Sequence, residues 1–152
     1  METSAAPLIR RACPGDAAAL LAMVEGLAAH HGDTATLTAE TLARDVFTDP
    51  PWVRVFVADA DRLVGYAALV PLAKFQAGER GMDIHHLFVD PERRGQRIGR
   101  GLVDAAIAEA QALGCRSITI GTHADNHDAQ ARYLAMGFQP ATPPGPRFRL
   151  RF

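Results

Sequence analysis

The feature that most constrains this chain is a stretch in which an apolar strand runs straight into a glycine-containing loop that opens a helix. The stretch is Ile84-His85-His86-Leu87-Phe88-Val89-Asp90-Pro91, followed by Glu92-Arg93-Arg94-Gly95-Gln96-Arg97-Ile98-Gly99-Arg100-Gly101-Leu102. At the start of a helix the backbone N–H groups are free and the dipole is positive, so anions bind there. Glycines let the backbone approach a phosphate, and arginines add charge-assisted hydrogen bonds. The stretch therefore predicts a phosphate or pyrophosphate site, with an ordinary turn flanked by solvated arginines as the alternative.

The rest of the chain alternates strand-like and helix-like segments, without a repeat or a linker. Helical spacing and capping residues predict helices from Pro14 to about His30, Thr38 to Asp49, Ile98 to Leu113, and Asp128 to Met136. Strands are expected at Leu8–Ala12, Val53–Ala58, Leu63–Leu69, Asp83–Val89, Arg116–Ile120, from Phe138, and at Arg147–Phe152. The order β-α-α-β-β-β-α-β-α-β-β predicts one α+β domain over residues 1–152, with a central sheet and helices on both faces.

Composition excludes several other classes of protein. With 152 residues, 48% of them hydrophobic, the chain suits one globular domain. No apolar stretch could span a bilayer, and Met1–Pro7 lacks signal-peptide features, so we expect a cytoplasmic protein without a membrane partner. Cys13 and Cys115 lack metal or redox spacing and are interpreted as reduced thiols. No metal is expected, since His123 and His127 straddle a strand end and a turn.

The loop stretch resembles the coenzyme A motif of the GNAT family of N-acetyltransferases. In that family a hydrophobic strand continues as Val-x-Pro, then Arg-Gly-x-Gly-x-Gly, then an aliphatic helix start. Val89-Asp90-Pro91 and the segment Arg94–Gly99 match this pattern. One departure is Arg97, which stands where the family has its first loop glycine. A register starting at Gln96 also fits the glycine spacing, but the distance from Pro91 favours the register starting at Arg94.

A second family motif, Asn…Ala…Tyr-x-x-x-Gly-Phe, is matched further along the chain. Its residues here are Asn126, Ala129, Tyr133, Gly137 and Phe138. Three shorter segments are similar to the diamine (spermidine/spermine) acetyltransferase branch, namely Leu37-Thr38, Pro50-Pro51-Trp52 and Val64-Gly65-Tyr66-Ala67. The resemblance implies the GNAT fold, with a mixed and mostly antiparallel sheet. It also implies an enzyme that transfers acetyl from acetyl-coenzyme A to a primary amine by direct attack in a ternary complex.

The resemblance also implies where the cofactor would bind. The backbone of the strand segment 87–89 would contact the pantetheine arm, and the N–H of Val89 would donate to the oxyanion. The loop amides would hold the pyrophosphate, which explains the arginine cluster better than nucleic acid does. The expected cofactor-binding residues are Leu87, Phe88, Val89, Arg94, Gly95, Gln96, Arg97, Ile98, Gly99, Arg100, Asn126, Asp128 and Ala129.

Two residues are expected to move protons. Tyr133 matches the family's general acid, since a phenol near pKa 10 can protonate a leaving thiolate; a packed core tyrosine is the alternative. His85 could deprotonate the amine, directly or through water, because an imidazole titrates near neutrality; a packed histidine is the alternative. The diamine branch has acidic residues where this chain has His85 and His86, which argues against polyamine acceptors. Only one of these imidazoles should face the cleft unless a β-bulge splays them.

The acceptor and the assembly are less constrained by the sequence. His31, His85, His86 and Trp52 are expected to border a small-molecule amine, with core packing as the alternative for Trp52. A non-catalytic acetyl-coenzyme A sensor or interaction module is the alternative function. The alternating tail Arg147–Phe152 is expected to pair in a homodimer.

Overall fold

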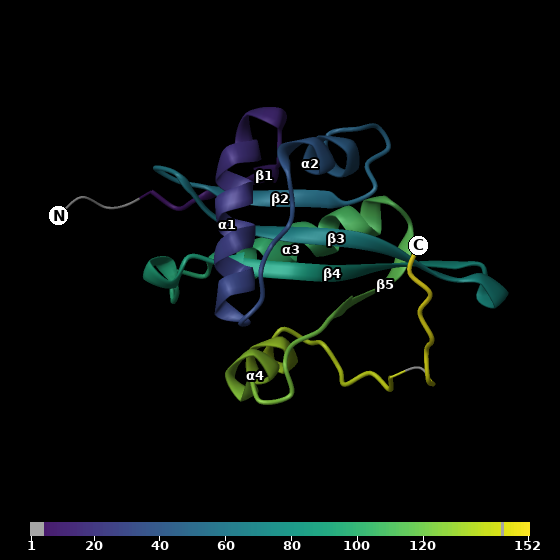
Figure 1. The fold of residues 1–152 in the computed structure, drawn as a ribbon. Coiled ribbons are helices and arrows are strands. Elements are labelled where there is room, and N and C mark those ends of the chain that lie inside the picture. Colours follow the sequence, from purple (N-terminus) through teal and green to yellow (C-terminus); the bar gives the residue numbers. More distant parts are fainter. Residues whose placement is uncertain (1–4, 144) are drawn as a thin grey trace. The chain divides into compact units, whose positions relative to one another are not determined.

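The computed structural model describes residues 5–143 and 145–152 (Figure 1). The first four residues of the N-terminal segment Met1–Pro7 lie outside this part of the chain. The described residues form two compact units, one up to Ile120 and the other from Gly121 onward. The first unit contains the whole sheet, and the second contains one helix and the C-terminal segment.

The first unit is built on a five-stranded sheet in the order β1-β2-β3-β4-β5. The strands are β1 (Leu8–Arg11), β2 (Arg54–Asp59), β3 (Leu63–Lys74), β4 (Glu79–Val89) and β5 (Cys115–Ile120). β1 to β4 pair antiparallel, whereas β5 runs parallel to β4. This confirms the predicted mixed, mostly antiparallel sheet. β3 and β4 are longer than predicted, because residues 70–74 pair with residues 79–83 in a hairpin.

Helices cover both faces of this sheet, as predicted. α1 (Ala17–His30) and α2 (Ala39–Val46) lie on one face, and α3 (Ile98–Ala112) lies behind the strands in Figure 1. Thr38 starts α2 as expected, since its hydroxyl accepts a hydrogen bond from the N–H of Thr41. α3 presents buried residues at helical spacing to the sheet, namely Ile98, Leu102, Val103, Ala106 and Ala110.

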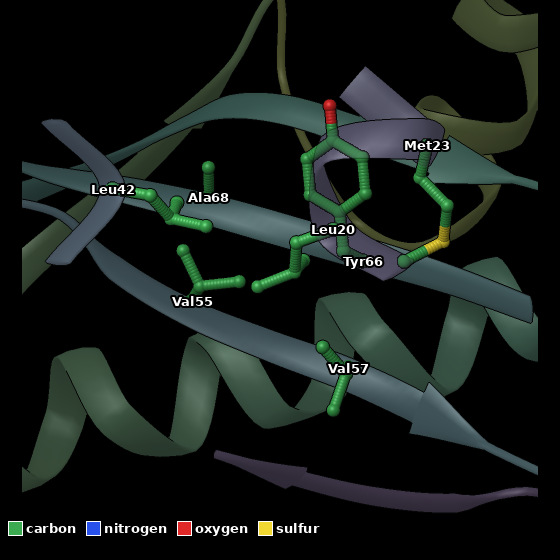
Figure 2. Close-up of a cluster of buried hydrophobic side chains, with 7 residues drawn as sticks. All are labelled: Leu20, Met23, Leu42, Val55, Val57, Tyr66 and Ala68. Atoms are coloured by element: carbon green, nitrogen blue, oxygen red, sulfur yellow. The ribbon is translucent and has the colours of Figure 1, made fainter. Parts of the chain in front are cut away.

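A hydrophobic cluster fills the space between α1, α2 and the sheet (Figure 2). Its buried members are Leu20, Met23, Leu42, Val55, Val57, Tyr66 and Ala68. Tyr66 is the one member with a polar side-chain atom. In Figure 2 its hydroxyl points away from Leu20 and Val57. The cluster therefore presents a single phenol group at its edge, on the face of the sheet that carries α1.

The second unit contains α4 (His127–Ala135) and the residues after it. Asn126 starts this helix by accepting a hydrogen bond from the N–H of Ala129 at 3.1 Å. The prediction of strands from Phe138 and at Arg147–Phe152 is wrong for the described residues, which form no helix or strand after α4. Alternation shows which side chains would share a face, but a strand also needs a partner, and Phe148, Leu150 and Phe152 are exposed.

Among the described residues, none of the helices is both long and apolar enough to cross a bilayer.

Candidate active site

The predicted phosphate loop connects the end of β4 to the start of α3. Asp90 begins a short turn over Pro91–Arg93 by accepting a hydrogen bond from the N–H of Glu92 at 2.9 Å. Gly95 then has φ 80° and Arg97, the residue before α3, has φ 62°. Among the described residues, Arg97 is the sole non-glycine residue with positive φ. The backbone at this position thus has the conformation that favours glycine, and Arg97 adopts it under strain.

The loop leaves its backbone donors available. Within residues 5–120, the N–H groups of residues 95–100 donate no hydrogen bond. These donors stand at the start of a 15-residue helix, where the dipole adds positive potential. Arg94 and Arg97 are exposed and make no ion pair within residues 5–143 and 145–152. The loop can therefore bind an anion through both amides and guanidinium groups.

The turn between β2 and β3 holds the first half of this loop. Arg93 pairs with Asp61 at 2.6 Å, and Arg62 pairs with Asp90. The bond from Arg93 is the main reason that the pKa of Asp61 lies below its usual range. The pKa of Asp90 is lowered chiefly by its bond to the N–H of Glu92 and then by its bond to Arg62. The guanidinium of Arg93 is therefore already paired with a carboxylate, unlike those of Arg94 and Arg97.

Beside the loop, β4 is paired with another strand on one side only. β4 pairs with β3 from Glu79 to Val89, but with β5 only from Arg80 to Ile84. The segment 85–89 consequently has an edge that no other strand of the first unit covers. Such an edge can bind an extended chain through backbone hydrogen bonds.

The ladder between β3 and β4 identifies which backbone groups face this edge. The N–H of Asp90 donates to the carbonyl of Val64 at 2.8 Å, which makes the adjacent pair Gly65 and Val89 a non-hydrogen-bonded pair. Pairs alternate along an antiparallel ladder, so the pair of Ala67 and Leu87 is also non-hydrogen-bonded. The N–H groups of Leu87 and Val89 therefore point away from β3, toward the uncovered edge.

A β-bulge in β4 brings the two predicted active-site histidines together. Ala68 pairs with His86 and Leu69 with Ile84, so His85 is the extra residue in the ladder. The two imidazole rings are stacked, with centroids 4.7 Å apart and planes inclined by 9°. Strict alternation would have sent them to opposite faces, but the bulge places both on the same side. His85 is exposed and His86 is half-buried.

His86 is also bonded to the edge of the hydrophobic cluster. The hydroxyl of Tyr66 and Nδ1 of His86 are 3.1 Å apart, which places both imidazoles on the face that carries α1. Burial lowers the pKa of His86, and the neighbouring His85 and His31 lower it further. Burial raises the pKa of Tyr66, so the phenol stays protonated at neutral pH. His31 ends α1 and is exposed.

Trp52 lies in a different place from these histidines. Its side chain is 77% exposed, so the core-packing alternative is wrong. It lines a shallow hollow between the end of α2 and the start of β2, together with Arg44, Asp45, Thr48, Pro50 and Pro51. None of the predicted histidines lines this hollow.

The remaining predicted residues belong to the second unit. Asn126 caps α4, Asp128 lies in its exposed first turn, and Ala129 is buried. Tyr133 is half-buried, with its ring 6.1 Å from that of Phe138, and burial raises its pKa. The first unit thus brings together the loop, the edge of β4 and the histidines, and the second unit brings together the residues of the second motif.

No role for Gly65 or for the hydroxyl of Tyr66 was predicted from the sequence. A Cβ at Gly65 would lie 2.7 Å from the carbonyl oxygen of Phe88, so β3 can approach β4 here only with glycine. The hairpin register is the signal that could have found both, since it sets Gly65 and Tyr66 against Val89 and Phe88.

Comparison with known proteins connects this geometry to one family. The sequence profile described as the acetyltransferase (GNAT) family matches residues 26–138, which include the loop, β4 and the second motif. A thialysine N-epsilon-acetyltransferase from Sus scrofa is 27% identical over 149 residues, covering 91% of this chain and 87% of that protein. A mycothiol acetyltransferase from Propionibacterium freudenreichii is 31% identical over 123 residues, or 78% of this chain, and the match spans only 38% of that longer protein.

Solved structures show the same fold at low sequence identity. An aminoglycoside acetyltransferase from an uncultured soil metagenomic sample superposes with a TM-score of 0.78 at 17% identity, covering 97% of this chain and 99% of that one. A ribosomal-protein-alanine N-acetyltransferase from Brucella melitensis gives a TM-score of 0.69 at 19% identity, covering 95% and 99%. With the profile match over most of its length, the chain therefore belongs to the acetyltransferase (GNAT) family.

Proposed function

We propose that this chain is an acetyl-coenzyme A-dependent N-acetyltransferase that acetylates a primary amine, and that residues 1–152 act as one catalytic domain. The observation that carries this proposal is the uncovered edge of β4, which leads directly to the free amides of the loop. A profile match that runs through both units, from residue 26 to residue 138, supports a single domain.

The residues of the first unit suit the cofactor. Acetyl-coenzyme A would supply the activated acetyl thioester. The amides of residues 95–100, with Arg94 and Arg97, would hold its phosphates, because they combine free donors with positive charge. The edge groups of Leu87 and Val89 would hydrogen-bond its amide-containing arm. Asn126, Asp128 and Ala129 would border it from the second motif, on the strength of the family resemblance.

Three groups of the chain would carry the chemistry. The N–H of Val89 would donate to the carbonyl oxygen as negative charge develops on it. His85, the exposed ring of the stacked pair, would accept the proton of the amine. Tyr133 would donate a proton to the leaving sulfur, and its raised pKa keeps it protonated for that role at neutral pH.

The acceptor is proposed to be a small-molecule amine bound on the α1 face, near His31, His85 and His86. The similarity to a thialysine N-epsilon-acetyltransferase over most of both chains supports a primary amine on a flexible side chain. The absence of carboxylates at positions 85 and 86 argues against a polyamine. Trp52 would contact only an acceptor large enough to reach its separate hollow.

Release of free coenzyme A thiol with a panel of primary amines tests the activity. Turnover is expected with at least one amine bearing a side-chain amino group. Thermal stabilisation by acetyl-coenzyme A without thiol release from any amine would favour a non-catalytic sensor or interaction module. Absence of both would refute binding at the loop.

We further propose a homodimer that works in the cytoplasm. The exposed alternation of Phe148, Leu150 and Phe152 supports pairing of this segment with a second copy. Cys13 and Cys115 are unpaired, which suits a reducing compartment. Light scattering that gives the mass of a single chain, 16.3 kDa, would refute the dimer.

A further inference from the structure

The bond between Tyr66 and His86 joins the hydrophobic cluster to the histidine pair. Tyr66 is 1% exposed, and its hydroxyl has one hydrogen-bond partner among the described residues, Nδ1 of His86 at 3.1 Å. No buried side-chain nitrogen or oxygen in that part of the chain lacks a partner. The phenol is therefore satisfied by this one contact.

The O–H of Tyr66 is a hydrogen-bond donor, and its one available acceptor among the described residues is Nδ1 of His86. A neutral imidazole has one N–H and one acceptor nitrogen, and the hydrogen bond made by one nitrogen fixes where the proton sits on the other. If Nδ1 accepts from Tyr66, the ring proton is on Nε2. The reverse arrangement, with Nδ1–H donating to the phenol, would leave a buried O–H without an acceptor, which is costly.

We propose that Tyr66 is a positioning residue of the active site, whose hydroxyl holds His86 as the neutral tautomer protonated on Nε2, so that His85 alone in the stacked pair can accept a proton. The consequence for catalysis rests on the proposed acetyl transfer, but the tautomer does not. His86 then presents Nε2–H as a fixed donor beside the ring of His85.

Three groups around His86 act in the same direction. A second proton on Nδ1 would break the bond from Tyr66 on β3, so that bond opposes protonation. The ring of His85 on β4 stacks 4.7 Å away, and two charged rings at that distance would repel. His31 at the end of α1 also lowers the pKa of His86, after burial and His85. All three oppose a positive charge on His86, which leaves His85 as the proton acceptor of the pair.

Nitrogen-15 NMR of the histidine-labelled protein tests the tautomer directly. The chain has six histidines, and the resonances missing from His86→Gln assign His86. We expect two-bond proton–nitrogen correlations typical of an Nε2–H ring, and a titration midpoint below the ordinary value. In Tyr66→Phe, which keeps the packed ring, the Nδ1 resonance should shift and the midpoint should rise, because the bond that opposes protonation is gone.

Either of two results would overturn the proposal. One is an Nδ1–H tautomer for His86 in the wild-type protein, a measurement that depends on no variant. The other is a folded Tyr66→Phe protein whose His86 midpoint and Nδ1 shift equal those of wild type. Neither readout requires turnover, so failure here is distinct from failure of the acetyltransferase assignment.

The pH dependence of kcat/KM tests the division of roles. His86→Gln keeps a donor near the position of Nε2 but cannot accept a proton, so its profile should retain the ionisation on the acidic limb. His85→Ala should lose that ionisation. The opposite pattern, with the ionisation lost only in His86→Gln, would assign the proton acceptor to His86 and contradict the proposal.

Discussion

Replacing Arg97 by glycine should stabilise the protein, although it removes a residue from the phosphate loop. Arg97 has φ 62°, and this left-handed backbone costs an L-residue about 1–2 kcal/mol. Glycine adopts it freely but loses about 0.4–1 kcal/mol more chain entropy on folding than alanine does. The difference predicts that Arg97→Gly is more stable than Arg97→Ala by roughly 0.5–1 kcal/mol.

Arg97→Ala is the matched control, because both variants lose the guanidinium and only one keeps Cβ. The assay is urea unfolding of the two variants in parallel, with thermal melts as a second measurement. For a chain of 152 residues the expected separation in Tm is about 1–4 °C. The reverse effect is expected at Gly95, where φ is 80°, so Gly95→Ala should destabilise by a similar amount.

Equal stability of Arg97→Gly and Arg97→Ala would refute this reasoning, since it would mean that the loop does not hold position 97 in the left-handed region. Acetyl-coenzyme A titration of the same two proteins then separates geometry from charge. Both lack the guanidinium, so a tighter Kd in the glycine variant would come from the relaxed backbone, whereas a loss common to both would come from the missing charge.

Three further predictions concern packing, pH and catalysis. Gly65→Ala should lower the free energy of unfolding by about 1–3 kcal/mol, because Cβ would lie 2.7 Å from the carbonyl oxygen of Phe88. At Gly15 a Cβ would meet nothing within 4 Å, so Gly15→Ala should change the free energy of unfolding little, and equal effects of the two variants in urea unfolding would contradict the prediction. The Arg10 guanidinium holds the pKa of Asp16 at about 2, against an ordinary 3.8, so the carboxylate should add about 2 kcal/mol of stability at pH 7 that is lost as the pH falls toward 2. In urea unfolding, Asp16→Asn should not show this loss of stability at low pH, and a pH dependence equal to that of wild type would refute the prediction. Tyr133→Phe should lower kcat for thiol release about 10²-fold or more with little change in the Kd of acetyl-coenzyme A, and unaltered turnover would return this tyrosine to packing.

The sequence was sufficient for those parts of the fold that depend on local patterns. The start of α2 follows from the capping chemistry of Thr38, and α3 follows from the helical spacing of its apolar residues. The strand that leads into the loop was predicted because an apolar run, a proline and glycines are all local signals. Its beginning was placed too late, because the hairpin extension to Glu79 depends on pairing with β3.

What the sequence did not provide depends on the register between strands. The bulge at His85 arises from an offset in the ladder with β3, which alternation within β4 does not encode. The hydrogen bond from Tyr66 to His86 depends on the same register. The predicted strand at Arg147–Phe152 was wrong for a related reason. Its alternating pattern shows which side chains would share a face, but it does not show which strand it would pair with.

Because two ion pairs connect the β2–β3 turn to the loop, salt should affect phosphate binding in two ways. Arg62 and the carboxylate of Asp61 are exposed, so dissolved ions can screen the bonds to Asp90 and Arg93. Raising the ionic strength would thus loosen the anchoring of the loop as well as weaken its attraction for a phosphate. The slope of affinity against salt should therefore be steeper than counting ligand charges suggests, and neutralising Asp61 and Arg93 together should flatten it.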